Sequence, residues 1–170
     1  MTLHVLVAYA TKYGATRGIA ERIAEVLRQA GLQVTLAEVD RAGSPTAYDA
    51  VVLGSGVYAG RWLAPAAAYL KTHAGALAER PTWLFSSGPT GSGDPVALMQ
   101  GWRFPQDLQA LAEQIRPRDV AFFHGAIWPE KLNLAERLIL KALKAPIGDF
   151  RDWAMIEGWA RRITAALAEA

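Results

Sequence analysis

The chain alternates between short apolar runs and longer stretches with helical periodicity. Five runs predict strands, over Leu3–Ala8, Val34–Val39, Ala50–Ser55, Thr82–Ser87 and Val120–Gly125. All except the second are nearly continuous rather than alternating, which is typical of strands that are covered on both faces. We therefore expect a buried sheet with helices packed on each side of it.

Periodic apolar residues predict four helices, over Thr16–Ala30, Trp62–Ala78, Pro105–Ile115 and about Asp152–Ala168. Gly31 is placed to end the first helix, and Pro65 is tolerable in the first turn of the second. The alternation of strands and helices predicts one α/β domain over residues 1–170, with a five-stranded parallel sheet of order 2-1-3-4-5.

An extra segment of about 25 residues, approximately 128–151, separates the last strand from the last helix. On a helical wheel the apolar residues of Lys131–Lys144 cover an arc of roughly 240°, more than twice what a surface helix needs. Three interpretations stay open. The helix could lie in an anionic membrane surface, could cover a hydrophobic substrate, or could pack on the protein itself or in a homodimer.

Composition excludes several classes of function. The 170 residues include 18 basic and 16 acidic side chains, and this net charge of +2 is too small to indicate a nucleic-acid partner. There is no cysteine, so disulfides, thiolate chemistry and cysteine-ligated metals are excluded. The three histidines, His4, His73 and His124, have no evident partners, and we predict no metal site. No apolar run reaches the roughly 18 residues of a membrane span, so we expect a soluble protein.

Ligands of such sheets bind at the carboxyl ends of the strands, where the strand order reverses. The first strand leaves the sheet through hydroxyls and a glycine, in the loop Thr11-Lys12-Tyr13-Gly14-Ala15-Thr16. Its N–H groups converge on a helix N-terminus, which carries about half a positive charge and binds phosphate without arginine. A simple capped turn with Thr16 as N-cap is the alternative interpretation.

Two more loops follow strands at the same edge. Ser55–Trp62 places two glycines around Tyr58, which suits a flat ring lying against the backbone. Ser86–Asp94 holds three glycines and four hydroxyls in nine residues, more than a reversal of the chain requires. A surface turn and a flexible linker are the alternatives for these loops taken singly, but independent turns have no reason to coincide at one edge.

These loops resemble the phosphate loop and the two isoalloxazine loops of the flavodoxin family, in the stretches TKYGAT, GSGVYAGRW and SSGPTGSGD. Nearly the whole chain is similar to the flavodoxin-like, menaquinone-dependent protoporphyrinogen IX dehydrogenase group. The matching stretches are YDAVVLGSGVYAGRW, HGAIWPEKLNLAERLILKAL and GDFRDWAMIEGWARRI. The resemblance implies a three-layer αβα sandwich that binds FMN noncovalently.

The family's cofactor-binding residues carry over to Thr11, Lys12, Tyr13, Gly14, Ala15 and Thr16 around the phosphate, to Gly56, Val57, Tyr58 and Ala59 along one side of the flavin, and to Ser87, Gly88 and Gly91 near its other edge. The loop Ser86–Asp94 contains no aromatic residue, unlike that of many flavodoxins. We therefore expect Tyr58 or Trp62 to cover one face of the flavin, with the other face open to substrate. Arg61, Arg103 and Arg151 are candidates to pair with substrate carboxylates.

The resemblance implies an oxidoreductase that passes electrons from a porphyrinogen through FMN to a quinone. The flavin carries this chemistry, so we assign no catalytic side chain. A soluble flavodoxin-type carrier between redox proteins, or a relative that has lost FMN, are the alternatives. The isoelectric point of about 9.0 argues against the carrier, since flavodoxins are typically acidic. We expect a cytoplasmic protein; the membrane interpretation of residues 131–144 would place it at the inner face of the cell membrane.

Overall fold

The computed structural model describes residues 1–169. Its central sheet contains five parallel strands in the order β2-β1-β3-β5-β6. Their bounds are His4–Ala10 for β1, Gln33–Glu38 for β2, Ala50–Tyr58 for β3, Thr82–Ser87 for β5 and Asp119–Phe123 for β6. This is the predicted order, because the two-residue strand β4, Arg61–Trp62, only pairs antiparallel with the end of β3.

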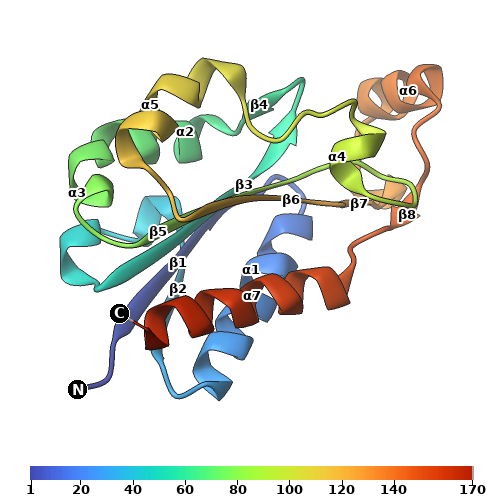
Figure 1. Ribbon diagram of the computed structural model, residues 1–170. Coiled ribbons are helices and arrows are strands. Elements are labelled where there is room, and N and C mark those ends of the chain that lie inside the picture. The colour runs from blue at the N-terminus through green and yellow to red at the C-terminus, as the bar shows by residue number, and fades with distance from the viewer. Residues whose placement is uncertain (170) are drawn as a thin grey trace.

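Helices cover both faces of the sheet (Figure 1). One face carries α1, Ala15–Gln29, and α7, Trp153–Ala168, whereas the other carries α2, Ala64–Thr72, α3, Ala74–Ala78, and α5, Gln109–Ile115. Short 3-10 turns occur at Val39–Arg41, Pro45–Ala47, Gln106–Leu108 and Pro129–Lys131. The three-layer αβα architecture predicted from the sequence is confirmed.

The extra segment forms a projection beyond the sheet (Figure 1). It contains β7, Ala126–Ile127, the helix α6, Leu134–Leu143, and β8, Gly148–Asp149, which pairs antiparallel with β7. A further short helix, α4, Pro95–Leu98, follows the third loop and is capped by the Asp94 carboxylate, which accepts from the Ala97 N–H at 3.1 Å. The helical pattern of the sequence predicted α6, but the sequence did not predict β7, β8 or α4.

The predicted helix over Trp62–Ala78 was wrong at its start and in its middle. Ala59 and Gly60 both adopt positive φ, so the chain reverses in a tight hairpin and Trp62 belongs to β4. Further on, His73 leaves helical geometry at φ −110° and ψ 16°, and this residue separates α2 from α3. The expected helix over Pro105–Ile115 likewise begins as a 3-10 turn before α5.

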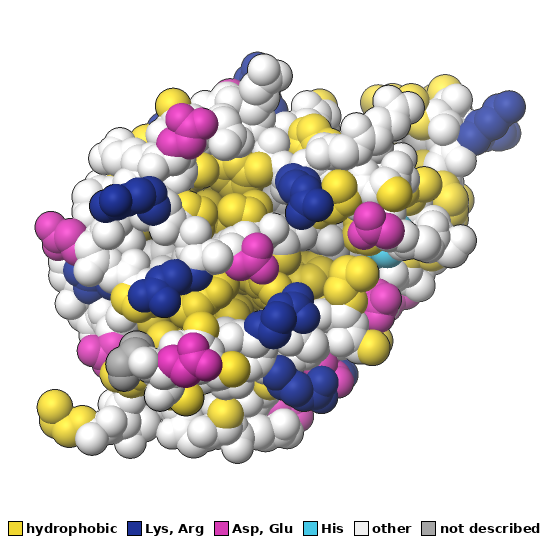
Figure 2. Space-filling model, in the orientation of Figure 1, with side chains coloured by type: hydrophobic (Ala, Val, Ile, Leu, Met, Phe, Trp, Pro, Cys, Tyr) yellow, Lys and Arg dark blue, Asp and Glu magenta, His cyan; other side chains and the backbone are white. Residues whose placement is uncertain are grey.

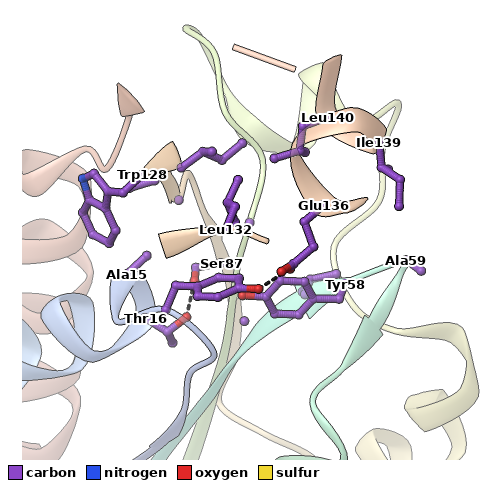
Figure 3. Close-up of a pocket in the computed structure, with 17 residues that line it drawn as sticks. Ala15, Thr16, Tyr58, Ala59, Ser87, Trp128, Leu132, Glu136, Ile139 and Leu140 are labelled. Atoms are coloured by element: carbon purple, nitrogen blue, oxygen red, sulfur yellow. Dashed lines mark hydrogen bonds between the residues drawn. The ribbon is translucent and has the colours of Figure 1, made fainter. Parts of the chain in front are cut away.

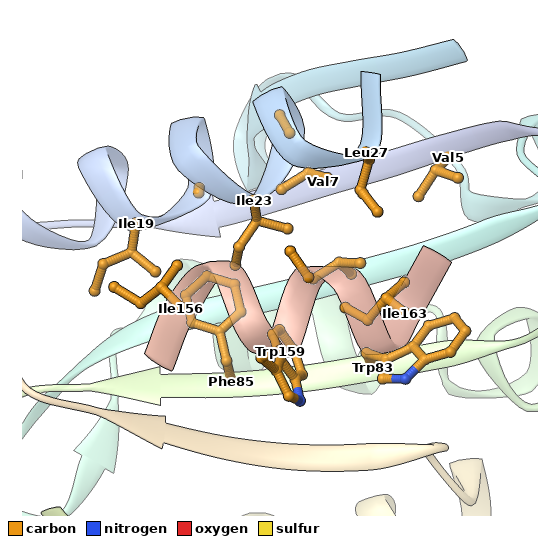
Figure 4. Packing of buried hydrophobic residues seen from close by; sticks show 14 of the residues in the cluster. Val5, Val7, Ile19, Ile23, Leu27, Trp83, Phe85, Ile156, Trp159 and Ile163 are labelled. Carbon is orange, nitrogen blue, oxygen red and sulfur yellow. The ribbon is translucent and has the colours of Figure 1, made fainter. Parts of the chain in front are cut away.

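One hydrophobic core lies between the sheet and the pair α1 and α7 (Figure 4). Ile19, Ile23 and Leu27 of α1 are fully buried, as the predicted apolar stripe requires. The Trp159 ring of α7 packs edge-on against Phe85 and Phe123, and its indole N–H donates to Asp119 Oδ2 at 2.9 Å.

Gly54 lets β3 pass beneath the ring of Phe85. A Cβ built on Gly54 would lie 2.1 Å from Phe85 Cζ, a distance that real Cβ atoms do not show. Both residues are adjacent partners in the parallel pairing of β3 with β5. The glycine therefore provides the space in which the fully buried Phe85 ring is packed.

We expect Gly54→Ala to lower the free energy of unfolding by about 1–3 kcal/mol, because the added methyl overlaps the Phe85 ring. Phe85→Leu loses packing but frees this space, so the double variant should lose less stability than the two single losses added together. Urea denaturation followed by tryptophan fluorescence measures each protein.

Gly75→Ala in α3 is the matched control for this experiment. A Cβ there meets no atom within 4 Å, and alanine is the better helix former, so stability should hold or rise by up to about 1 kcal/mol. Strictly additive losses at Gly54 and Phe85 would contradict the packing argument.

Candidate functional site

A cavity of about 340 Å³ opens at the carboxyl edge of the sheet, within the range of about 300–1,000 Å³ typical of small-ligand pockets. Figure 3 shows side chains from the loops and from α6 converging on it. Its lining comes from the segments that follow β1, β3, β5 and β6: Tyr13, Ala15, Thr16, Gly56, Val57, Tyr58, Ala59, Ser87, Gly88, Gly125, Ala126, Ile127, Trp128, Leu132, Glu136, Ile139 and Leu140.

The loop after β1 presents an uncapped helix N-terminus. Gly14 is the N-cap of α1, with φ +98°, and its own N–H donates to Thr11 Oγ1 at 2.9 Å. No side chain caps the helix, and its first turn contains no acidic residue. The N–H groups of that turn have no intrahelical acceptors, so the loop offers them to an anion.

Thr16 joins this loop to the third one. Its Oγ1 lies 2.9 Å from Ser87 Oγ, and both residues are buried (Figure 3). Thr16 lies in the first turn of α1 rather than at its N-cap, so the alternative interpretation as a cap was wrong. The hydrogen bond fixes the spacing between the loops after β1 and β5.

The second loop is a β-hairpin. Tyr58, at the end of β3, is 41% exposed and lines the cavity, where its ring can lie against a flat ligand. Trp62 is only 5% exposed and its indole N–H donates to Ser86 Oγ at 2.8 Å, so it packs inside the protein. Of the two aromatics expected to cover a flavin face, Tyr58 alone is in position.

His124 organises the third loop. One ring nitrogen lies 3.1 Å from the Pro89 carbonyl oxygen and the other 2.6 Å from that of Gly93, and the residue is 3% exposed. No partner for this histidine was evident in the sequence, because its partners are backbone atoms of a loop more than 30 residues away. His124 therefore holds the glycine-rich loop Ser86–Asp94 against the end of β6.

The segment after β6 forms the remaining wall of the cavity. Covering a substrate was one of the three interpretations left open for this helix, but none of its residues was among the predicted site residues. Glu136 and Leu140 of α6, with Leu132 just before the helix, are partly buried at a spacing of four residues and face the site. This spacing, together with a position at the carboxyl end of a strand, is the signal that could have identified them.

Glu136 connects α6 to the first loop. Its Oε1 accepts from the Asn133 N–H while Asn133 caps the Glu136 N–H, a capping box that starts the helix. Its Oε2 accepts from the Tyr13 hydroxyl and from Lys12 Nζ, the latter at 3.2 Å. The Tyr13 hydrogen bond lowers the pKa of Glu136, and the same contact raises the pKa of Tyr13.

Nine of the thirteen residues proposed for cofactor binding line the cavity. The other four, Thr11, Lys12, Gly14 and Gly91, lie outside its lining. The first three belong to the loop that surrounds the α1 N-terminus, whereas Gly91 packs toward Leu98 and Pro146. Of the candidate arginines, Arg151 is engaged with Asp149 at 2.6 Å, and Arg61 and Arg103 are exposed.

Comparison with known proteins identifies the fold family. Residues 6–152 match the family model described as the flavodoxin domain. The chain belongs to the flavodoxin family. Its cofactor is FMN, and the residues present fit this group: an uncapped helix N-terminus suits the phosphate, and apolar walls with Tyr58 suit the ring. The protein is a flavodoxin-type flavin oxidoreductase.

Individual relatives cover nearly the whole chain. Protoporphyrinogen IX dehydrogenase [quinone] of Escherichia coli K12 is 26% identical over 177 residues, covering 95% of this chain and 94% of the relative. The flavodoxin of Streptococcus pneumoniae TIGR4 superposes with a TM-score of 0.58 at 15% identity, covering 96% of this chain and 99% of that one.

The rubredoxin oxygen:oxidoreductase of Desulfovibrio gigas gives a TM-score of 0.61 at 16% identity. Its match covers 98% of this chain but only 36% of the larger protein. At these identities, the two structural likenesses establish the fold alone.

Residues 1–169 contain no group of three or more His, Asp and Glu side chains arranged to hold a metal ion. Within the same part of the chain, every helix is too short or too polar to cross a membrane.

We expect the contact between Glu136 of α6 and the loop after β1 to weaken in acid. The pKa of Glu136 is lowered from its ordinary value of 4.5 by Tyr13 and Lys12, so the contact is fully present above that value and is lost as pH falls through the lowered pKa. Amide hydrogen exchange over residues 134–143, corrected for the intrinsic effect of pH, measures this.

Glu136→Gln is the control, because it keeps the side-chain size and removes the titrating carboxylate. Its exchange in α6 should be faster at neutral pH and should not change further on acidification. The same dependence of α6 protection on pH in the wild-type protein and in Glu136→Gln would exclude this role for Glu136.

Proposed function

We propose that this protein is an FMN-dependent dehydrogenase that oxidises a porphyrinogen, with a quinone as the electron acceptor. The observation that carries the proposal is the apolar wall that the extra segment adds beside the cofactor loops, formed by Leu132, Ile139 and Leu140. FMN, when bound, supplies the two-electron redox chemistry.

The chemistry of the cavity fits a large apolar substrate better than a protein partner. Its lining around α6 is apolar except for Glu136, which is already engaged by Tyr13 and Lys12. Exposed Arg61 lies next to the Tyr58 hairpin, where it can pair with a substrate carboxylate. The Escherichia coli relative, by its name, acts on protoporphyrinogen IX with a quinone.

In this proposal the side chains bind and orient rather than react. Tyr58 lies at the mouth of the cavity, Leu140 and Leu132 exclude water from the opposite side, and Thr16 with Ser87 fixes the spacing of the loops. None of these groups is required to become charged or covalently attached.

We expect the protein loaded with FMN to oxidise protoporphyrinogen anaerobically in the presence of a menaquinone analogue. Leu140→Asn, which keeps the size but places an amide in the apolar wall, should lower kcat/KM for the porphyrinogen about tenfold. Its FMN affinity should stay within about twofold of wild type. Porphyrin fluorescence measures turnover, and flavin fluorescence quenching measures binding.

Turnover and FMN binding, measured together, distinguish a dehydrogenase from an electron carrier. FMN binding without porphyrinogen oxidation would favour a carrier between redox proteins. Equal kcat/KM for wild type and Leu140→Asn would exclude α6 as a wall of the substrate site.

We further propose that α6 contacts an anionic membrane surface. Large hydrophobic side chains more than 40% exposed are Met1, Tyr58, Leu98, Met99, Leu134, Leu138, Ile139, Leu143 and Ile147. All except Met1 lie in the cofactor loops, in α4 or directly after it, or in the extra segment. Figure 2 shows hydrophobic side chains at the surface on this end of the molecule.

The charges of α6 complement an anionic lipid. Its one acidic residue, Glu136, is turned inward to the first loop, whereas Arg137 and Lys141 are exposed beside Leu134 and Leu138. A basic helix with an exposed apolar face binds at the headgroup boundary. A quinone acceptor, which is dissolved in the bilayer, would then lie close to the cavity.

We expect the protein to float with vesicles containing about one third phosphatidylglycerol, and Leu134→Asp/Leu138→Asp to remain in the unbound fraction. The exposed pair Gln109→Asp/Gln114→Asp in α5 adds the same charge elsewhere and should float like wild type. Equal flotation of all three proteins would count against α6 as the membrane contact.

A further inference from the structure

Positive side chains from the extra segment gather at the N-terminus of α1. Lys131 Nζ donates to the Tyr13 carbonyl oxygen at 3.0 Å, and a Cβ built on Gly14, the N-cap, would lie 3.7 Å from this nitrogen. Arg151 donates to the Ala15 carbonyl oxygen at 3.2 Å. Lys12 of the loop itself is the third cation.

Two of these cations have carboxylate partners. Lys12 pairs with Glu136 at 3.2 Å, and Arg151 pairs with Asp149 at 2.6 Å. Lys131 has no carboxylate within 4.0 Å among residues 1–169, and its ammonium instead lies 4.4 Å from the centre of the Trp128 ring. The cluster around Gly14 therefore keeps one uncompensated positive charge.

The position of this charge is unfavourable without a bound anion. A helix N-terminus carries about half a positive charge, and a cation beside it is repelled. The first turn of α1 has no acidic residue that would offset the repulsion. A phosphate group at the same place would be attracted both by the helix and by the ammonium.

We propose that Lys131 is a ligand of the FMN phosphate, contributed by the extra segment to the loop before α1. The proposal rests on FMN as the cofactor and deepens the site used in the proposed function. The loop then binds phosphate through backbone N–H groups and hydroxyls, while Lys131 adds a charge-assisted hydrogen bond. Because Lys131 lies in the short turn that leads into α6, cofactor binding also holds the helix that forms the wall of the cavity.

The experiment compares FMN with riboflavin, which has the same ring but no phosphate. Dissociation constants are measured by flavin fluorescence quenching for wild type, Lys131→Gln and Lys131→Arg. Lys141→Gln is the matched control, because it removes the same charge from the exposed face of the neighbouring helix. Melting temperatures of the four cofactor-free proteins verify that each is folded.

We expect Lys131→Gln to weaken FMN binding tenfold or more and riboflavin binding less than twofold, with Lys131→Arg and Lys141→Gln close to wild type. Unchanged FMN affinity in Lys131→Gln, or an equal loss for both flavins, would overturn the role of Lys131. Failure of the wild-type protein to bind either flavin would instead overturn the FMN-dependent function.

Discussion

Parallel pairing of the strands determines where every functional loop must lie. β1, β3, β5 and β6 run in one direction, so the segments that follow them leave the sheet at a single edge. The register brings Ser55 beside Ser86, and the hydrogen bond between Thr16 and Ser87 then fixes two of the loops to each other. The cavity is a consequence of this pairing, since no single loop encloses it.

Much of this arrangement could be predicted, because it depends on local patterns. Short apolar runs identified the five long strands, four of them nearly continuous, and helix α1 followed from helical periodicity alone. The hydroxyls and glycines of Thr11–Thr16 indicated a phosphate loop for the same reason: their chemistry is carried by a short stretch of chain. The family resemblance then supplied the cofactor.

The remainder depends on contacts between residues far apart in the sequence. Trp62 was read as part of a helix because nothing nearby indicates that its indole N–H meets Ser86. The backbone partners of His124 are equally invisible in the sequence. Glu136 was assigned no role from the sequence, yet it binds Lys12, 124 residues before it. Such pairings depend on how the strands and helices are arranged in space, and a local sequence pattern does not show them.

The extra segment owes its position to these long-range contacts rather than to a core. No residue of α6 is fully buried, whereas α7 buries five residues against the sheet. The polar contacts of Glu136 and Lys131 are solvent-accessible, and contacts of this kind each contribute little to stability. A ligand that covers the apolar side chains of α6, and a phosphate that binds Lys131, would add contacts that hold the helix in place. The helix that projects farthest from the fold is therefore the element whose position depends most on what the site binds.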